Sequence, residues 1–477
     1  MEMATEKRAS LPILYLSRQQ SKEASDVYSH PRAYPWYVIT SASSVFGHEC
    51  LSHGPLFSAL ERLDRRTRRP GAKRWSLQHL HLTALLMIYA TDEAIKDRFE
   101  WARECVIEML PSRRRPGRSY QGFKKAQKRL CPKMVAHLKD HLRQHHRRVA
   151  GPFWERFGWV PFACDGSRVE VPRTTRNKQR LGCAGREKTG PQLFLTTLYH
   201  MGTGLPWDWH IGKGTDSERD HLRLMLPKLP PGSLIVADAG FTGYALMQAM
   251  LAGGFSFLIR AGANVSLLSG LDLEWEMSSD KQVVWLWPRN KRSLPPLKLR
   301  LIRVKRESPG AGEMCLLTNV FDRERLPDET AAVLYRMRWG VELFFRSYKQ
   351  TLRQHKMRSK APRTARWEVH WGMTALLLLG LMSVAQIVER GRDPLSLSVA
   401  AALRVVRQAM RSHRPWRGRG GLAVRLAGAV KDEYGRRGSK KAHDWPHKKH
   451  ESPPGLPRIQ PASEEESRQA QRIYAAA

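Results

Sequence analysis

Short strand-like runs and helical segments alternate between residues 155 and 260, and this alternation restricts the fold of the chain more than any other feature. The first strand-like runs are Trp159–Cys164, Gln192–Tyr199 and Trp207–Ile211. A helical stretch over residues 217–229 follows, and Ser233–Ala237 is then typical of a buried strand that leads into a helix over about 244–252. Strands that give way to alternating helix and strand predict an α/β fold, with a mixed sheet and flanking helices.

The segments outside this alternation divide the chain into three regions. Residues 1–150 are mostly helical and basic, and residues 155–390 form the expected α/β core. Within the core, residues of about 260–328 hold further strand-like runs separated by turns rich in Pro, Lys and Arg, which indicates a β-rich insertion. Residues 391–477 are again basic, and we expect them to form a partly disordered tail.

Charge is the strongest bulk property of the chain. Its 81 Lys and Arg exceed its 44 Asp and Glu by 37, which favours a polyanionic partner, nucleic acid first and an anionic membrane surface second. One run of cations contains no acidic residue: Arg113, Arg114, Arg115, Arg118, Lys124, Lys125, Lys128 and Arg129. Tyr120 and Phe123 lie within it as stacking candidates, so we expect the region 1–150 to bind DNA. A solvated linker is the alternative interpretation of this run.

The chain is expected to be a soluble, intracellular protein. Its longest apolar run, Thr374–Ala385, is shorter than the roughly 18–20 residues that span a bilayer, so a buried helix is the better interpretation. No secretory signal is visible at the start of the chain. The six cysteines contain no C-x-x-C pair, which argues against a zinc cluster and fits a reducing compartment.

Two aspartates occupy similar places in the predicted core. Asp165 and Asp238 each end an apolar strand shortly before a glycine, which lets the backbone turn away. Carboxylates at the ends of neighbouring strands converge on one point, and their repulsion is relieved by a divalent cation. The alternative is that each aspartate only caps a turn, which is the commoner role of Asp before Gly.

A third acidic residue lies on a helix predicted over residues 328–352, with Asp328 as its N-cap. At 100° per residue, Tyr335, Arg338 and Lys349 share with Glu342 a stripe about 60° wide, beside an apolar face. A single carboxylate among cations and a phenol suits a metal ligand next to a phosphate backbone. The alternative is a solvated face on which Glu342 pairs with arginines four residues away. A second, very apolar helix is predicted over about 371–390.

The spacing Tyr-x2-Arg-x3-Glu-x6-Lys resembles the third acidic segment of DDE transposases of bacterial insertion sequences, in the Tyr-Arg-Glu-Lys (YREK) branch of insertion sequence family four. Asp165-Gly166-Ser167 resembles the first segment of that family, and Val236 to Phe241 the second. The intervals between the acidic residues are 73 and 104 residues, and the longer one contains the expected β-rich insertion. The resemblance covers roughly residues 155–390.

The resemblance implies a ribonuclease H-like core in which Asp165, Asp238 and Glu342 hold two Mg²⁺ ions, with Mn²⁺ able to substitute. It implies an enzyme that cleaves the ends of its insertion sequence and joins the 3′-OH ends to target DNA. Tyr335, Arg338 and Lys349 would bind phosphates around the scissile bond, and Trp285 or Trp287 would stack on a flipped base. Packing within the insertion is an equal alternative for the two tryptophans. The implied partners are double-stranded DNA and a second copy of the chain, in the bacterial cytoplasm at the nucleoid.

Two other functions remain open at this point. One is a catalytically silent, transposase-derived DNA-binding protein, and the other is a two-metal nuclease of the same fold. The remaining carboxylates near the predicted site are interpreted as salt-bridge or surface residues: Glu170, Asp208, Asp216, Glu218 and Asp220. His200 and His210 are interpreted as structural residues, and Cys164 as a core residue.

Overall fold

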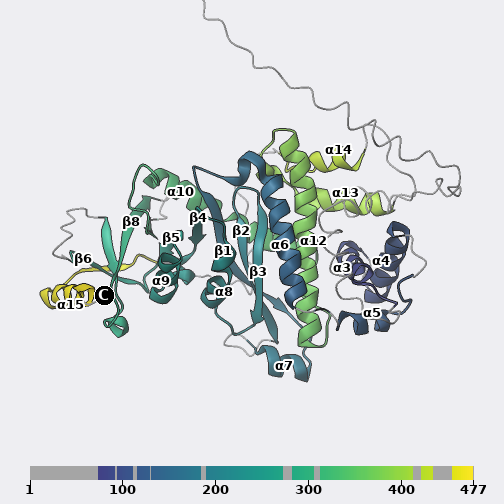
Figure 1. The fold of residues 1–477 in the computed structure, drawn as a ribbon, viewed down its shortest axis with the longest axis horizontal. Helices are drawn as coiled ribbons and strands as arrows, with labels where there is room; N and C mark the ends of the chain where they lie inside the picture. Colours follow the sequence, from purple (N-terminus) through teal and green to yellow (C-terminus); the bar gives the residue numbers. More distant parts are fainter. Residues whose placement is uncertain are drawn as a thin grey trace, which may run out of the picture. The chain divides into compact units, whose positions relative to one another are not determined.

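The protein is described by a computed structural model that covers residues 74–91, 94–110, 115–128, 130, 132–183, 190–271, 282–305, 312–411, 421–432 and 454–475. Within these ranges ten strands form one sheet, in the order β10-β6-β7-β8-β9-β5-β4-β1-β2-β3 (Figure 1). The sheet contains both parallel and antiparallel pairs, so the expected mixed α/β architecture is confirmed.

The core half of the sheet has five strands, and the first four correspond to the strand-like runs that the sequence predicts. The five strands are β1 (Val160–Glu170), β2 (Gln192–His200), β3 (Leu205–Lys213), β4 (Ser233–Ala237) and β5 (Ser256–Ala261). The first three form antiparallel hairpins, whereas β4 runs parallel to both β1 and β5. Because β4 is buried along its whole length, it has the continuous apolar sequence of a central parallel strand.

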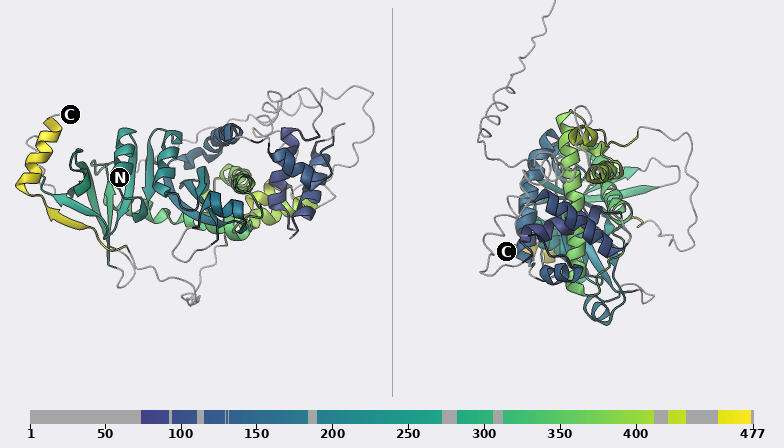
Figure 2. Two further views of the ribbon diagram at one scale, coloured as in Figure 1. Left: turned by 90° about the horizontal axis from the view of Figure 1, so that it is seen from below. Right: turned by 90° about the vertical axis from the view of Figure 1, so that its right-hand side faces the viewer.

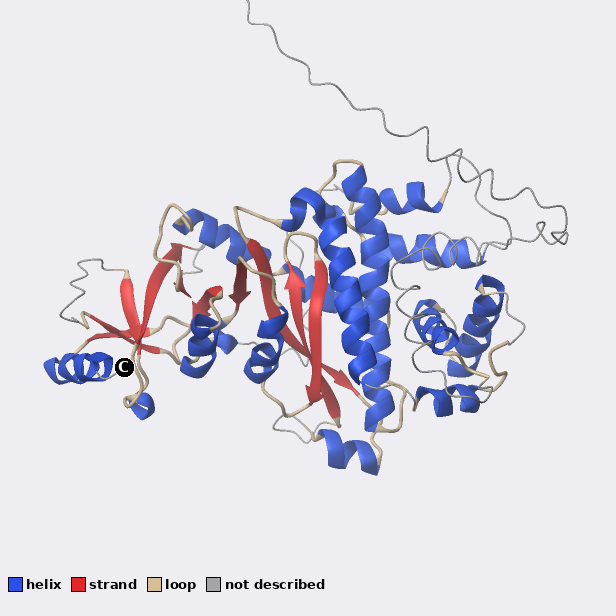
Figure 3. Cartoon of the chain, viewed as in Figure 1, coloured by secondary structure: helices blue, strands red, loops and turns tan. Residues whose placement is uncertain are grey.

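Helices cover both faces of this half of the sheet, as Figure 3 shows. Alternate residues of β1 divide between two hydrophobic clusters, with Phe162 in one and Ala163 in the other, because successive side chains of a strand point to opposite faces. The cluster of Phe162 includes residues of α8 (Glu218–Met225) and α9 (Tyr244–Ala252). The cluster of Ala163 includes residues of α6 (Pro132–Ala150) and α12 (Pro362–Glu389).

The β-rich insertion continues the core sheet instead of forming a separate unit. Its strands are β6 (Ser266–Ser269), β7 (Val283–Leu286), β8 (Leu297–Lys305) and β9 (Glu313–Thr318). The connection is made by β9, which pairs antiparallel with both β5 and β8. The ladder of backbone hydrogen bonds therefore runs unbroken from the core into the insertion.

Parts of the region 391–477, where we expected a partly disordered tail, are ordered. Helices α13 (Val399–Arg411) and α14 (Leu422–Ala427) pack against α12. Strand β10 (Arg458–Pro461) pairs with β6, and α15 (Glu464–Ala475) follows it at that end of the sheet (Figure 2). The cations of residues 433–453 lie outside the described residues.

The described part of region 1–150 is helical, as expected. It contains α3 (Leu77–Tyr89), α4 (Ile95–Met109), α5 (Tyr120–Gln127) and α6. Phe123 is buried against Trp75 and Phe99, which corrects its interpretation as a stacking group for DNA. Arg113, Arg114 and Arg129 lie outside the described residues.

The predicted helix over 328–352 is interrupted. It consists of α10 (Asp328–Met337), α11 (Gly340–Arg346) and a π-helical turn (Ser347–Thr351). Between α10 and α11 the backbone hydrogen bonds shorten to three residues, and a Cβ on Gly340 would lie 2.8 Å from the Tyr199 hydroxyl. The close approach of Tyr199 thus requires glycine at the break. The N-cap is Pro327, whereas Asp328 lies in the first turn and binds Arg300.

Helix α12 extends further than the predicted 371–390. By length and composition it is apolar enough to cross a membrane, but 78% of its apolar stretch is buried inside the protein. It contacts α3, α6, α13 and α14, and in Figure 1 it lies beside α6 over β3. This agrees with the prediction of a buried helix.

Helix α8 provides a matched test of the packing. Leu222 lies on the inner face of this helix and is fully buried, whereas Leu224 on the same helix is 63% exposed. We expect Leu222→Ala to lower the free energy of unfolding by about 2–5 kcal/mol, because it removes buried methyl groups and leaves a cavity. Leu224→Ala is expected to change it by less than about 0.5 kcal/mol. Urea denaturation of the full chain measures both, and equal losses would contradict this assignment of the two faces of α8.

Candidate active site

Asp165 and Asp238 lie side by side where β1 and β4 separate. The parallel pairing of β1 with β4 ends at Cys164 and Ala237, and each aspartate directly follows one of these two residues. Asp238 follows the end of β4, as predicted. Asp165, in contrast, is inside β1, where it pairs with Thr197 of β2, so its expected place at a strand end is wrong. The parallel register nevertheless brings the two carboxylates to one edge, as expected.

The glycines that follow these aspartates leave room for the close approach of other side chains. A Cβ on Gly166 would lie 2.6 Å from the Phe194 ring and 2.9 Å from a carboxylate oxygen of Glu218. A Cβ on Gly240 would lie 2.9 Å from the other Glu218 oxygen and 3.0 Å from Asp238 Oδ1. The Glu218 carboxylate therefore lies between the two glycines, and its oxygen is at most 5.9 Å from Asp238 Oδ1, the sum of the last two distances.

Glu218 is the site residue that the sequence analysis missed. It is the first residue of α8, and we interpreted it there as a surface or salt-bridge residue. No hydrogen bond or ion pair of its carboxylate occurs among the described residues. The signal for it in the sequence is the glycine one or two residues after each aspartate, because both glycines make room for the same side chain. We call Asp165, Asp238 and Glu218 the acidic cluster.

Glu342 and its neighbours approach the acidic cluster from α10 and α11. Glu342 Oε1 accepts a hydrogen bond from Arg338 at 3.0 Å, across the break between the two helices. The Arg338 guanidinium lies 5.5 Å from the centre of the Tyr335 ring. Lys349 is on the π-helical turn and interacts electrostatically with Asp165. Glu342 is thus paired with an arginine four residues away, as in the alternative interpretation, and Lys349 lies within electrostatic range of Asp165 on a discontinuous helix.

The carboxylates of the site influence each other's protonation. Burial raises the pKa of Asp165 to about 7, and the charges of Asp238 and Glu218 act in the same direction. Burial likewise raises the pKa of Glu218, with Asp238 adding to it. For Glu342, burial raises the pKa and Asp238 adds to this effect, while the bond with Arg338 opposes it. Carboxylates with raised pKa values that share one edge of a sheet are typical of active sites.

The donor set fits a hard divalent cation. All of its oxygens are carboxylate oxygens, which Mg²⁺ prefers, and the repulsion among them is relieved by positive charge. Among the described residues, however, no three His, Cys, Asp or Glu side chains lie close enough to hold one ion in this conformation. Glu342 is engaged with Arg338, so it would have to leave that partner to join the aspartates.

The two tryptophan candidates of the insertion are interior residues. Trp285 on β7 and Trp287 just after it are 4% and 3% exposed, and they pack with Ala470 of α15. The Trp287 indole donates a hydrogen bond to the Leu294 carbonyl and lies under the Arg292 guanidinium. This conformation favours core packing, because stacking on a base would require either ring to leave the cluster.

Most of the other polar residues near the predicted site have the structural roles that we expected. Asp208 is paired with Lys139 and Arg143, and His200 bonds to Thr203 and the Trp154 carbonyl. Cys164 is fully buried. Asp216 pairs with His221 and Asp220 with Arg223, while Glu170 is exposed.

Comparison with known proteins gives a family-model match that covers most of the core. Residues 160–378, from the start of β1 into α12, match the family model described as Transposase DDE domain. This range includes Asp165, Asp238 and Glu342.

A curated relative agrees with the domain match. The transposase InsG of insertion sequence element IS4 from Escherichia coli (strain K12) is 25% identical over 276 residues. The alignment covers 55% of this chain and 60% of the length of that relative. Both matches are to transposases, and the domain match lies over the candidate site. A solved synaptic complex of piggyBac transposase with hairpin DNA is similar over 83% of this chain and 87% of its own. Its TM-score is 0.40 and its identity 12%, too low to establish a shared fold.

The raised pKa of Asp165 predicts how stability depends on pH. In the folded chain the pKa is about 7, against 3.8 for an ordinary aspartate, so the folded state binds the proton more tightly. The stability linked to this group is therefore fully present below pH 3.8 and is lost as pH rises through about 7. We expect Asp165→Asn to stabilise the chain more at pH 8 than at pH 5, by on the order of 2 kcal/mol.

Urea denaturation in EDTA at the two pH values measures this difference. The exposed pair of Asp220 and Arg223 supplies the control, since Asp220→Asn makes the same chemical change away from the acidic cluster. An equal effect of Asp165→Asn at both pH values would mean that its carboxyl titrates normally.

Proposed function

We propose that this protein is a transposase that binds the ends of an insertion sequence, cleaves them and joins their 3′-OH ends to target DNA. The observation that carries the proposal is the register of β1 and β4, which brings Asp165 beside Asp238. The match of residues 160–378 to the Transposase DDE domain supports the same assignment. We place the chain in the Tyr-Arg-Glu-Lys branch because Tyr335, Arg338, Glu342 and Lys349 occupy the four positions of that spacing.

We assign the core to the ribonuclease H-like architecture. Its support is the strand order β3-β2-β1-β4-β5, with three antiparallel strands followed by two that run parallel to β1. Helices on both faces agree with that assignment. In this arrangement one edge of the sheet receives acidic residues from the strands and from a late helix. The expected division into 1–150, 155–390 and 391–477 is retained as a proposal.

Asp165, Asp238 and Glu342 are proposed to hold two Mg²⁺ ions, for which Mn²⁺ can substitute. When bound, such ions lower the pKa of an attacking water and stabilise the leaving oxygen of a phosphodiester. The chain itself supplies the positions: β1 and β4 fix the aspartates through backbone ladders, and α11 carries Glu342. Arg338 keeps Glu342 oriented until it moves toward the aspartates.

Tyr335, Arg338 and Lys349 are proposed to contact DNA phosphates next to the scissile bond. Arg338 and Lys349 are cations within electrostatic range of the acidic cluster, so a phosphate that reaches the carboxylates also meets positive charge. Once Glu342 turns to a metal ion, the Arg338 guanidinium is available for a phosphate oxygen. Trp285 and Trp287 are retained as base-stacking candidates only in a rearranged insertion.

Double-stranded DNA is the proposed partner, both as the ends of the element and as the target. The excess of 37 positive charges favours such a polyanion. Two ends have to be cut in one event, so we propose a homodimer that acts on DNA at the bacterial nucleoid.

The catalytic assignment is tested by Mg²⁺-dependent joining of a pre-cut DNA end to plasmid. We expect Asp165→Asn, Asp238→Asn and Glu342→Gln each to lower joining by more than about a hundredfold, since each removes a ligand oxygen charge. Binding of the same DNA in EDTA should stay within about twofold of the wild type. Asp216→Asn is a matched control, because this carboxylate pairs with His221 outside the cluster.

The same assay separates the alternatives. Cleaved DNA without joined product identifies a two-metal nuclease, and binding without either reaction identifies a silent DNA-binding protein. Joining that survives Asp165→Asn or Asp238→Asn would refute the proposed site.

Glu218 is proposed as a fourth carboxylate of this site. Its oxygens lie beside both glycines of the acidic cluster and have no competing partner among the described residues. We expect Glu218→Gln to weaken Mn²⁺ binding by about 10–100-fold, because it removes one negative charge from the metal environment. Calorimetric titration of the DNA-free protein with Mn²⁺ measures this loss, with Asp220→Asn as the control. Unchanged Mn²⁺ affinity would assign Glu218 a packing role only.

A further inference from the structure

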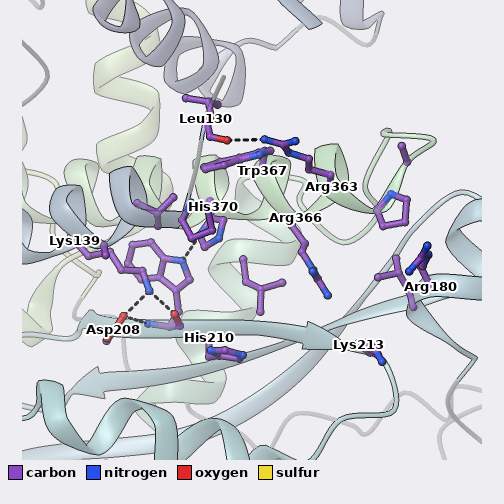
Figure 4. A pocket seen from close by; sticks show the side chains of 18 of the residues that line it. Leu130, Lys139, Arg180, Asp208, His210, Lys213, Arg363, Arg366, Trp367 and His370 are labelled. Carbon is purple, nitrogen blue, oxygen red and sulfur yellow. Dashed lines mark hydrogen bonds and ion pairs between the residues drawn. The ribbon is translucent and has the colours of Figure 1, made fainter. Parts of the chain in front are cut away.

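A cavity of about 1090 Å³ is lined in part by β3. None of its lining residues belongs to the acidic cluster. Its walls come from α6, α12, the strand β3 and α7 (Thr175–Leu181). Figure 4 shows Arg366 reaching from α12 toward β3, into the space between that helix and the side chains of Arg180 and Lys213. We call this space the basic cavity.

Positive charge greatly exceeds negative charge in the lining of the basic cavity. Eight Lys and Arg residues contribute to it, and the only carboxylate among its lining residues is Asp208. That carboxylate is already neutralised, because it accepts a hydrogen bond from Lys139 at 2.6 Å and lies 3.2 Å from Arg143. Arg363 is also engaged, since it donates to the carbonyls of Lys128 and Leu130.

Five cations of the lining remain without a hydrogen-bond or ion-pair partner in the described part of the chain: Arg176, Arg180, Lys213, Lys228 and Arg366. The Nε of Arg366 is buried and donates to nothing. A buried donor without an acceptor is costly, and an anion in the cavity would supply the acceptor. These cations come from separate elements and still face one space, which distinguishes them from an ordinary solvated helix face.

The walls of the basic cavity are apolar where the cations are absent. Val135 of α6, Leu181 of α7 and Ile211 of β3 line it. A ligand with an anionic edge and a flat, apolar body matches this division better than a free inorganic anion does. The volume is of the size that encloses a small molecule, so it admits one or two nucleotides of a single strand and excludes a duplex.

The cavity is connected to the acidic cluster through the chain. Helix α7 follows β1 after only four residues, so Arg176 and Arg180 lie shortly beyond the strand that carries Asp165. The bridge between Glu170 and Lys356 attaches the end of β1 to the segment that precedes α12. A DNA strand that passes the acidic cluster and follows β1 is thereby led toward the basic cavity.

We propose that the basic cavity binds an unpaired segment of a DNA strand, with phosphates on Arg180, Arg366 and Lys213 and a base against the apolar wall. This inference rests on the proposed action on DNA, and it adds a site that the chemistry of the acidic cluster does not require. Single-strand sites of proteins combine cations along the backbone with a surface on which bases pack, as this cavity does.

The test compares binding of a duplex with a single-stranded overhang and binding of the blunt duplex, by fluorescence anisotropy in EDTA. We expect the double variant Arg180→Gln/Arg366→Gln to weaken binding of the overhang DNA about tenfold or more and of the blunt duplex by less than about twofold. The slope of log affinity against log salt should fall by about 1.4, that is, by about 0.7 for each lost phosphate contact. Arg223→Gln/Arg468→Gln is the control of equal charge, because both arginines are exposed outside the cavity.

A second variant tests the cavity without a change of charge. Ala136 on α6 lines the cavity, so we expect the larger side chain of Ala136→Trp to occupy the cavity and weaken binding of the overhang DNA. Because Ala136 is exposed, we expect the melting temperature to stay nearly unchanged. Equal losses for overhang and blunt DNA would overturn the single-strand assignment. Binding of inorganic pyrophosphate without any effect on DNA would overturn it in favour of a small anion. Because no reaction occurs in EDTA, failure of the joining assay leaves this result intact, and the reverse also holds.

Discussion

The parallel pairing of β1 with β4 is the constraint on which the site depends. Its ladder ends at Cys164 and Ala237, which are both fully buried, and the next residue of each strand is an aspartate. Neither carboxylate can retreat without breaking backbone hydrogen bonds or exposing the apolar residues before it. The sheet thus holds two aspartates close together, and the pKa of Asp165 is raised mainly by its burial, with the charge of Asp238 acting in the same direction.

The surroundings of the pair are arranged around the same constraint. Gly166 and Gly240 leave the space that Glu218 occupies, so a third carboxylate lies close to the two aspartates. On the other side, Arg338 holds Glu342 and thereby keeps one carboxylate out of the cluster. Arg338 and Glu342 are four residues apart and bond across the break between α10 and α11, where Tyr199 packs against Gly340. A metal ion would exchange the Arg338–Glu342 pair for a shared coordination sphere, which links occupancy of the site to the conformation of this helix.

Much of the core could be predicted from the sequence, because its signals are local. Buried strands such as Ser233–Ala237 and helices such as Tyr244–Ala252 follow from apolar runs bounded by glycine and proline. The extension of β1 past Asp165 could not be predicted, since it depends on pairing with β2 and not on hydrophobicity. The continuation of the sheet through β9 and the pairing of β10 with β6 are contacts between distant segments, which composition does not encode. Glu218 was missed because its position is defined by two glycines far from it along the chain.

The charges of the molecule oppose each other in a way that suits a metal-dependent reaction on DNA. The net positive charge attracts a polyanion at long range, and the unpaired cations of the basic cavity give such a strand local partners. The acidic cluster repels the same phosphates at short range, because Asp165, Asp238 and Glu218 add negative charge where a scissile group would have to lie. Asp165, Asp238 and Glu342 would hold the proposed divalent cations, whose positive charge would offset this repulsion. Under the proposed function, attraction by the cationic surface would be general, whereas approach to the carboxylates would depend on the ion.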